Sequence, residues 1–184
     1  MPKYASFPKM GKAGNLVKSR KNQYIRRNEN MIKILFICHG NICRSTMAQS
    51  VFQYLTDQAG LSEQFYIDSA ATSREEIGNP PHYGTQQKLR QVGIPCIPHR
   101  ARQMRREEYD QFDYIIGMDS WNIRNINRIL GNGDPDGKVS KLLDFTDRKG
   151  QDIADPWYTG NFDETYRDVK EGCEALLDEC LLRL

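Results

Sequence analysis

The chain has 184 residues, of which 39% are apolar and 27% are charged, a balance typical of one folded globular domain. No apolar run approaches the roughly 20 residues that a membrane-spanning helix needs, so we expect no membrane association. Residues 1–30 hold eight of the 26 Lys and Arg and one of the 24 Asp and Glu, which leaves the rest of the chain with a net charge of −5. This acidic remainder argues against nucleic acid as a partner.

Residues 1–30 combine their basic charge with Pro, Gly, Ser and Asn, and show neither helical nor strand periodicity, so we predict a disordered extension. The segment lacks the apolar core of a secretory signal. A transit-like segment, a polyanion-binding arm and an extension upstream of the domain are three interpretations. We favour the last, because Met31-Ile32-Lys33-Ile34 is typical of an ordinary domain start, and we predict that the domain covers residues 31–184.

The stretch from residue 32 to residue 59 places a cysteine and an arginine around one short loop. Residues 32–37 are apolar and predict a buried first strand, which ends at Cys38. Five residues separate Cys38 from Arg44, and residues 46–59 then show a helical pattern. Free N–H groups and the positive end of a helix favour a tetrahedral anion and also stabilise a thiolate. The loop therefore offers a nucleophile inside a phosphate-binding cradle.

The rest of the chain alternates strands with helices, which predicts a single α/β domain built as a sandwich around a parallel sheet. Ligands of such sheets bind beyond the carboxyl ends of the strands, where Cys38 would lie. In chain order the patterns predict a strand over 65–68, a helix over 82–92, an extended piece at 96–99, a short helix over 105–110, a strand over 114–118, a helix from Asp119 or Ser120 to Leu130, a strand over 138–143, a polar loop over 144–160, and a last helix over 162–184 with Asn161 and Glu164 as a capping box.

Hydrolysis of a phosphate monoester needs three groups, and the chain contains a candidate for each. A thiolate nucleophile splits the reaction into two easier steps, and Cys38 can supply it. A guanidinium can grip two phosphate oxygens at once, which suits Arg44. A general acid must protonate the leaving oxygen, and we favour Asp155 because the proline after it keeps it extended. Trp157 and Tyr158 could stack on an aromatic leaving group, although an ordinary Asp-Pro turn is the alternative for this segment.

Other residues of the loop suit the same chemistry. Gly40 permits unusual backbone angles, and Asn41 tolerates a left-handed conformation and can hold the loop by hydrogen bonds. Ser45 can donate a hydrogen bond to the sulfur of Cys38 and help it leave in the second step, or it can cap the helix. Cys43 either fills space in the loop or forms a protective disulfide with Cys38, and both interpretations stay open.

Residues 36–45 closely resemble the signature of the low-molecular-weight protein tyrosine phosphatases, and the resemblance extends over about residues 31–184. Four further segments contribute to it: Asp68-Ser69-Ala70, His99-Arg100-Ala101-Arg102, residues 112–119 and Asp155-Pro156-Trp157-Tyr158. It implies a three-layer sandwich around a four-stranded parallel sheet, with the phosphate-binding loop between the first strand and the first helix. It also implies a metal-independent phosphocysteine mechanism, in which Cys38 is the nucleophile, Arg44 binds phosphate and Asp155 is first acid and then base.

Three positions depart from the usual pattern of that family. Thr46 stands where proline is usual, and since threonine can also start a helix we expect little loss. The segment 73–78 lacks the aromatic residue often found at the rim of the site, and Glu75 near that position should repel acidic phosphopeptides. Trp157 replaces a more usual tyrosine. The substrate-binding residues that we expect are His39, Gly40, Asn41, Ile42, Cys43, Ser45, Glu75, Trp157 and Tyr158.

Related proteins on this scaffold have other activities. Those that dephosphorylate phosphoarginine often carry threonine between the loop asparagine and the second cysteine, where this chain has Ile42. The bulk of Ile42 favours a flat phenyl ring, so we expect phosphotyrosine-containing proteins or small aryl phosphates as substrates and inorganic phosphate as product. Arsenate reductases need a disulfide relay, which Gln103, seven residues after Cys96, interrupts. A non-catalytic phosphate-binding module is the remaining alternative.

The five cysteines show no metal-finger spacing, so we expect neither a metal nor a cofactor. Their odd number and the lack of a secretory signal favour a reduced, cytoplasmic setting. Cys173 and Cys180 lie seven residues apart on the last predicted helix, which predicts thiols in the core. We expect a monomer or a weak dimer.

Overall fold

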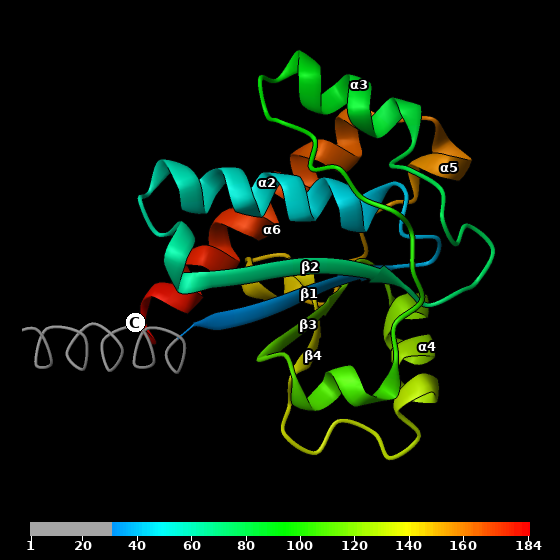
Figure 1. Ribbon diagram of the computed structural model, residues 1–184, viewed down its shortest axis with the longest axis vertical. Helices are drawn as coiled ribbons and strands as arrows, with labels where there is room; N and C mark the ends of the chain where they lie inside the picture. Colours follow the sequence, from blue (N-terminus) through cyan, green and yellow to red (C-terminus); the bar gives the residue numbers. More distant parts are fainter. Residues whose placement is uncertain (1–30) are drawn as a thin grey trace, which may run out of the picture. The chain divides into compact units, whose positions relative to one another are not determined.

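A computed structural model of the chain describes residues 31–184, so the disordered extension predicted for residues 1–30 lies outside the described residues. One four-stranded sheet runs through the domain in the order β2-β1-β3-β4, and every pairing in it is parallel (Figure 1). Its strands are β1 (Ile32–Cys38), β2 (Phe65–Ala71), β3 (Tyr114–Gly117) and β4 (Val139–Lys141). The predicted α/β fold around a parallel sheet is therefore confirmed.

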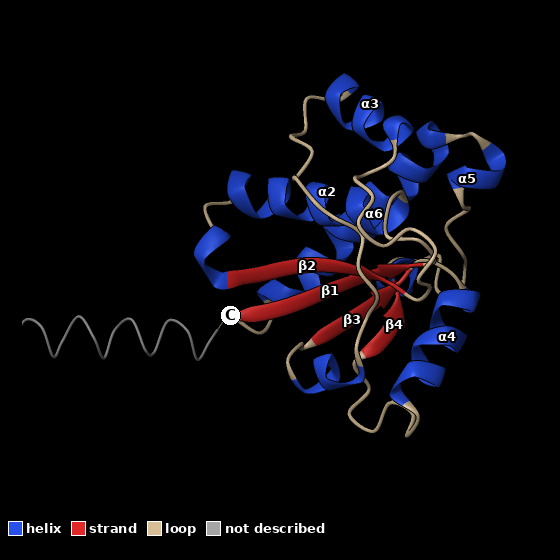
Figure 2. Ribbon diagram, turned by 45° about the vertical axis from the view of Figure 1, so that its right-hand side comes forward, coloured by secondary structure: helices blue, strands red, loops and turns tan. Residues whose placement is uncertain are grey.

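Helices cover both faces of this sheet and complete the three layers (Figure 2). One face is covered by α2 and α6, on which α3 packs in turn, and the other is covered by α4 and the short helix η2. The helices are α2 (Arg44–Gln58), α3 (Tyr83–Gln91), α4 (Ser120–Leu130), α5 (Pro156–Thr159) and α6 (Phe162–Leu181), with the 3₁₀ helices η1 (Ser62–Gln64), η2 (Arg106–Asp110) and η3 (Leu142–Phe145).

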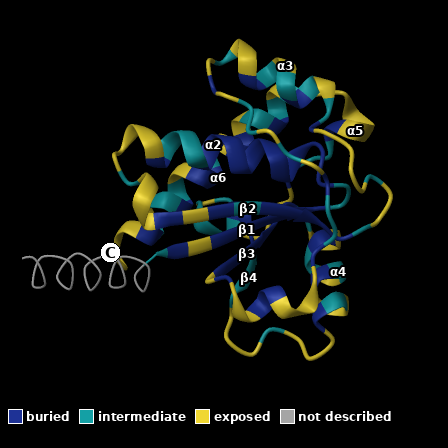
Figure 3. Cartoon of the chain, viewed as in Figure 1, coloured by how far each residue is buried: buried dark blue, intermediate teal, exposed yellow. Residues whose placement is uncertain are grey.

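The sequence of β1 explains its central position. Ile34 and Phe36 point to the face covered by α2 and α6, whereas Leu35 and Ile37 point to the face covered by η2 and α4. All four side chains are fully buried, as Figure 3 shows for the middle of the sheet. Burying each of them contributes roughly 1.5–3 kcal/mol, so the core fixes the strand and its carboxyl end.

The order of the strands locates a ligand site at that end. Because β2 and β3 flank β1 on opposite sides, the direction of winding reverses at β1, and such a switch point is where α/β sheets bind ligands. β1 ends at Cys38, which pairs with Ala71 of β2. The loop that follows leads directly into α2.

Three segments differ most from what the sequence patterns predict. β2 continues to Ala71 instead of ending at residue 68, because its last three residues pair with the end of β1. β4 is shorter than the predicted 138–143, since the chain turns into η3 and places Leu142 and Leu143 in the core. The predicted polar loop over 144–160 contains the one-turn helix α5.

The ends of the helices follow the predicted caps with small shifts. Asp119 caps α4 by accepting the N–H of Asn122 at 2.6 Å, and Asn161 caps α6 by accepting the N–H of Glu164 at 3.0 Å. α2 begins two residues before Thr46, whose hydroxyl donates to the carbonyls of Ile42 and Cys43 at 2.9 and 3.0 Å. Threonine at this position therefore ties the loop to the helix.

Within residues 31–184, no helix is both long and apolar enough to cross a membrane. The two cysteines of α6, Cys173 and Cys180, are fully buried, as predicted. Burial raises the pKa of Cys180 to about 12, so this thiol stays neutral and acts as an apolar core group.

Candidate active site

The thiol of Cys38 lies at the end of β1 under two hydrogen-bond donors. The backbone N–H of Asn41 donates to the sulfur at 3.2 Å, and the hydroxyl of Ser45 lies 3.1 Å from it. Because the Ser45 oxygen already accepts a hydrogen bond from the Asn41 amide at 3.0 Å, its own proton is available to the sulfur. Both donors stabilise negative charge on the sulfur, whether in the thiolate or in a departing thiolate.

Asn41 holds the loop in the shape that points its N–H at the sulfur. Its φ is +59°, the only positive value at a non-glycine residue within the described range, and its side chain is fully buried. The amide nitrogen donates to Ser45 and to Ser69, and the amide oxygen accepts from His99 Nε2 at 2.7 Å and from the N–H of Arg102 at 3.1 Å. Burial lowers the pKa of His99, so a neutral ring with its proton on Nε2 fits this contact.

The guanidinium of Arg44 is anchored at one end and open at one edge. Its Nη1 donates to the Asp119 carboxylate at 2.5 Å and to the Ile153 carbonyl at 3.0 Å, while its Nη2 contacts the Asp155 carboxylate at 2.6 Å. Nε is buried and has no hydrogen-bond partner within residues 31–184. Nε and Nη2 share one edge of the planar group, and this edge matches two oxygens of a phosphate.

Arg44 keeps its charge although only 2% of the residue is exposed. Burial by itself lowers the pKa of the guanidinium and is the largest single effect, while the negative charges of Cys38 and Asp155 raise it. Asp119 adds both charge and a hydrogen bond, and the pKa of Arg44 is raised overall. The guanidinium therefore stays charged beside Asp155.

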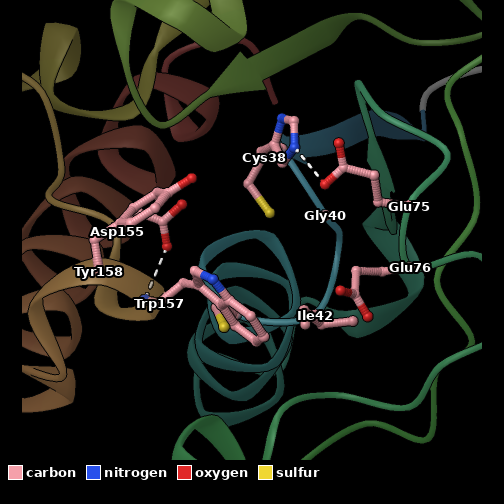
Figure 4. Close-up of a pocket in the computed structure, with 10 residues that line it drawn as sticks. Cys38, Gly40, Ile42, Glu75, Glu76, Asp155, Trp157 and Tyr158 are labelled. Atoms are coloured by element: carbon pink, nitrogen blue, oxygen red, sulfur yellow. Dashed lines mark hydrogen bonds and ion pairs between the residues drawn. The ribbon is translucent and has the colours of Figure 1, made fainter.

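Asp155 reaches the pocket from the opposite wall, where it is the N-cap of α5. One carboxylate oxygen accepts the N–H of Trp157 at 3.1 Å, and the other faces Arg44. Proline at the first helical position suits the start of this short helix. In Figure 4 the Asp155 carboxylate and the Cys38 sulfur both point into the same cavity. A proton donor and a nucleophile can thus act on one substrate.

The cavity has an acidic side and an aromatic side (Figure 4). Glu75 and Glu76 lie on one side, and Trp157 and Tyr158 lie on the other. Its lining residues are Cys38, His39, Gly40, Ile42, Cys43, Glu75, Glu76, Asp155, Trp157 and Tyr158. Arg44, Asn41 and Ser45 do not line the cavity, but Arg44 bonds to Asp155, and Asn41 bonds to Ser45 behind the loop. The structure thus brings together all the predicted site residues.

Cys43 differs from Cys38 although both belong to the same loop. Burial raises the pKa of Cys43 to about 12, and the negative charges of Cys38 and Asp155 contribute. At about pH 8 the Cys43 side chain therefore stays protonated. Cys43 is therefore a neutral thiol that packs with Ile42 and Ala101 under the loop.

We accordingly expect iodoacetamide at about pH 8 to alkylate Cys38 and to leave Cys43 unmodified, because the thiolate is the reacting form. Peptide mass spectrometry after a short exposure measures both sites in one sample. The same reagent on the unfolded chain should label both cysteines and serves as the control. Equal labelling of the two cysteines in the folded protein would contradict the assignment.

Within residues 31–184, no group of three or more His, Cys, Asp and Glu side chains is arranged to hold a metal ion.

Residues 33–183 match the family described as low molecular weight phosphotyrosine protein phosphatase. The chain belongs to this family. It is 45% identical over 148 residues to the low molecular weight protein-tyrosine-phosphatase YfkJ of Bacillus subtilis, covering 80% of this chain and 94% of that protein. It is 40% identical over 149 residues to the low molecular weight phosphotyrosine protein phosphatase of Homo sapiens, covering 79% and 94%.

Comparison with solved structures agrees with the assignment of this phosphatase to the family. The crystal structure of YfkJ matches with a TM-score of 0.79 and 42% identity over 83% of this chain and 96% of that one. The Drosophila arginine phosphatase matches with a TM-score of 0.73 and 30% identity over 80% and 97%. The predicted family, fold class and enzyme class, a low-molecular-weight protein tyrosine phosphatase and thus a hydrolase, are confirmed.

Three residues of this phosphatase enter the site without having been predicted there. Asp119 was predicted only as a helix cap, yet its second oxygen anchors Arg44. Glu76 lines the cavity beside Glu75. His82 caps α3, and its ring stacks on Phe162 at 5.4 Å and meets the edge of Trp157 at 5.7 Å. The partners of these residues are distant in the chain, so no local pattern indicates the contacts.

Proposed function

We propose that this phosphatase hydrolyses phosphotyrosine in proteins, and small aryl phosphates, through a phosphocysteine intermediate, and that it releases inorganic phosphate. One observation carries the proposal: the groups for attack, phosphate binding and proton transfer converge on one cavity. Arg44 lies 2.6 Å from Asp155, and two donors lie 3.1 and 3.2 Å from the sulfur of Cys38.

In the first step the Cys38 thiolate attacks phosphorus, a sulfur–phosphorus bond forms and the bond to the phenolic oxygen breaks. Asp155 gives its proton to that oxygen, so the substrate leaves as the neutral phenol. Nη1 of Arg44 keeps its hydrogen bonds to Asp119 and to the Ile153 carbonyl, while Nε and Nη2 bind two phosphate oxygens. The movement of Nη2 from Asp155 to phosphate also frees the carboxyl group for proton transfer.

In the second step a water molecule attacks phosphorus and gives a proton to Asp155. The sulfur–phosphorus bond breaks, and Cys38 leaves as a thiolate that accepts hydrogen bonds from Asn41 and Ser45. The phosphate then departs, and the cycle needs no reductant or metal. Preorganised donors of this kind act on charge that develops in the transition state.

The walls of the cavity support an aromatic phosphate as substrate. Ile42 is a bulky apolar group that lines the same cavity as Cys38, and Trp157 and Tyr158 offer exposed rings at the mouth. The likeness to an arginine phosphatase makes phosphoarginine the second candidate. Its flexible aliphatic chain gains less from stacking on the same walls.

The decisive experiment compares two peptides of one sequence that carry either phosphotyrosine or phosphoarginine. We expect kcat/KM for phosphotyrosine to be at least about tenfold higher, the range that shape discrimination in one pocket provides. A higher kcat/KM for the phosphoarginine peptide would instead identify phosphoarginine as the substrate. Binding of inorganic phosphate without turnover of either peptide would instead indicate a non-catalytic phosphate-binding module.

We further propose that the phosphatase is cytoplasmic and acts as a monomer or weak dimer on protein substrates. All five cysteines are free thiols, which supports a reducing compartment. The net charge of −5 outside residues 1–30 supports proteins, and neither nucleic acid nor membranes, as partners.

A further inference from the structure

Two neighbouring glutamates form one side of the cavity mouth. Glu75 and Glu76 belong to the segment that follows β2, and Figure 4 shows both facing the cavity opposite Trp157 and Tyr158. The side chain of Glu75 is 72% exposed, so its charge meets any group that approaches the mouth. We call these two residues the acidic rim.

The second glutamate of the acidic rim is fixed in position. Its side chain lies over the phosphate-binding loop, where a Cβ added to Gly40 would sit 3.1 Å from the Cγ of Glu76. One carboxylate oxygen of Glu76 accepts a hydrogen bond from the Asn79 amide at 2.6 Å. Since Asn79 is neutral, this contact orients the carboxylate without cancelling its charge.

The residues that line the mouth supply little positive charge against the acidic rim. None of the lining residues is Lys or Arg, and His39 is the one side chain among them that can become cationic. Its Nε2 lies 3.1 Å from Glu75, so it can offset one of the two glutamates when it is protonated. Arg44 is buried, and two carboxylates already neighbour it. The side chains that line the mouth therefore present net negative charge to the residues beside a bound phosphotyrosine.

We propose that the acidic rim selects phosphotyrosine that is flanked by lysine or arginine. This inference rests on the proposed function, because it names the sequence context that the same cavity accepts. A basic neighbour forms an ion pair with Glu75 or Glu76 as the phosphate descends to Cys38. An acidic neighbour is repelled by the same carboxylates. The aromatic side of the mouth adds a second attraction, since a guanidinium or ammonium also stacks on Trp157 or Tyr158.

The preference is expected to be several-fold, because these ion pairs are exposed to solvent. Two peptides with one phosphotyrosine core, flanked on both sides by Lys or by Glu, measure it directly. For the natural chain we expect kcat/KM to be about five- to twentyfold higher for the basic peptide, with the ratio decreasing as salt is added. Replacing the rim by Glu75→Lys/Glu76→Lys should move this ratio at least about tenfold toward the acidic peptide.

A matched control carries the same change of net charge elsewhere. Glu107→Lys/Glu174→Lys alters η2 and α6, and neither residue lines the cavity, so we expect it to keep the preference of the natural chain. Glu75→Gln/Glu76→Gln removes the rim charges with little change of shape and should bring the ratio close to one.

The outcomes separate this inference from the proposed function. Equal kcat/KM for the two peptides with the natural chain overturns the role of the acidic rim, while turnover of both preserves the phosphotyrosine activity. Turnover of neither peptide refutes the proposed function and the inference with it. An equal shift in the control variant assigns the preference to overall charge and overturns the role of the rim.

Discussion

Replacing Cys38 with serine is expected to lower turnover of phosphotyrosine peptides and of p-nitrophenyl phosphate by at least about 10⁴-fold. The cradle at the end of β1 stabilises a sulfur anion through the N–H of Asn41 and the hydroxyl of Ser45. A serine hydroxyl at the same position stays neutral. Within residues 31–184, the groups that hydrogen-bond to this position are the Ser45 hydroxyl and the Asn41 N–H, and neither can act as a base. Without the thiolate there is no covalent intermediate to divide the reaction.

The measurement needs a control that separates chemistry from folding. Cys96→Ser makes the same change at a thiol that lies outside the cavity, and it should retain turnover. Both variants should unfold at temperatures close to that of the natural chain, since each replaces one sulfur atom by oxygen. Activity that survives in Cys38→Ser would disprove the proposed nucleophile.

The floor of the site could be predicted because its signals are local. The apolar run that ends at Cys38 specifies a strand. The glycine and the asparagine after it specify a turn, and the helical pattern that follows at once specifies a helix N-terminus, all within one short stretch of sequence. Each of these features depends on neighbours along the chain. The same holds for the caps at Asp119 and Asn161, whose partners are three residues away.

The rest of the site depends on contacts between distant segments. Asp119 anchors Arg44 because α4 and α2 begin at the same edge of the sheet, and nothing in the pattern around residue 119 distinguishes this role from capping. The ring of His82 meets Trp157 and Phe162 only after α3 packs against α6. The shortness of β4 and the single turn of α5 are likewise set by packing and not by periodicity.

Removing the carboxyl group of Asp155 should lower kcat/KM by about 10²–10⁴-fold for aryl phosphates with poor leaving groups, and far less for p-nitrophenyl phosphate. The reason is that kcat/KM reports the steps through formation of the phosphocysteine, in which Asp155 protonates the departing oxygen. A nitrophenolate leaves without that proton, whereas an unsubstituted phenolate does not. The dependence of kcat/KM on the acidity of the leaving group should therefore steepen.

Two variants divide this effect from the structural role of the same side chain. Asp155→Asn keeps an oxygen that can accept the N–H of Trp157 and cap α5, whereas Asp155→Ala loses the cap as well. If proton transfer is the function, both variants show the same steep dependence on the leaving group. In both, kcat also falls for every substrate, because the water of the second step lacks its base. An equal loss of kcat/KM across all leaving groups would show that Asp155 only positions Arg44 and α5.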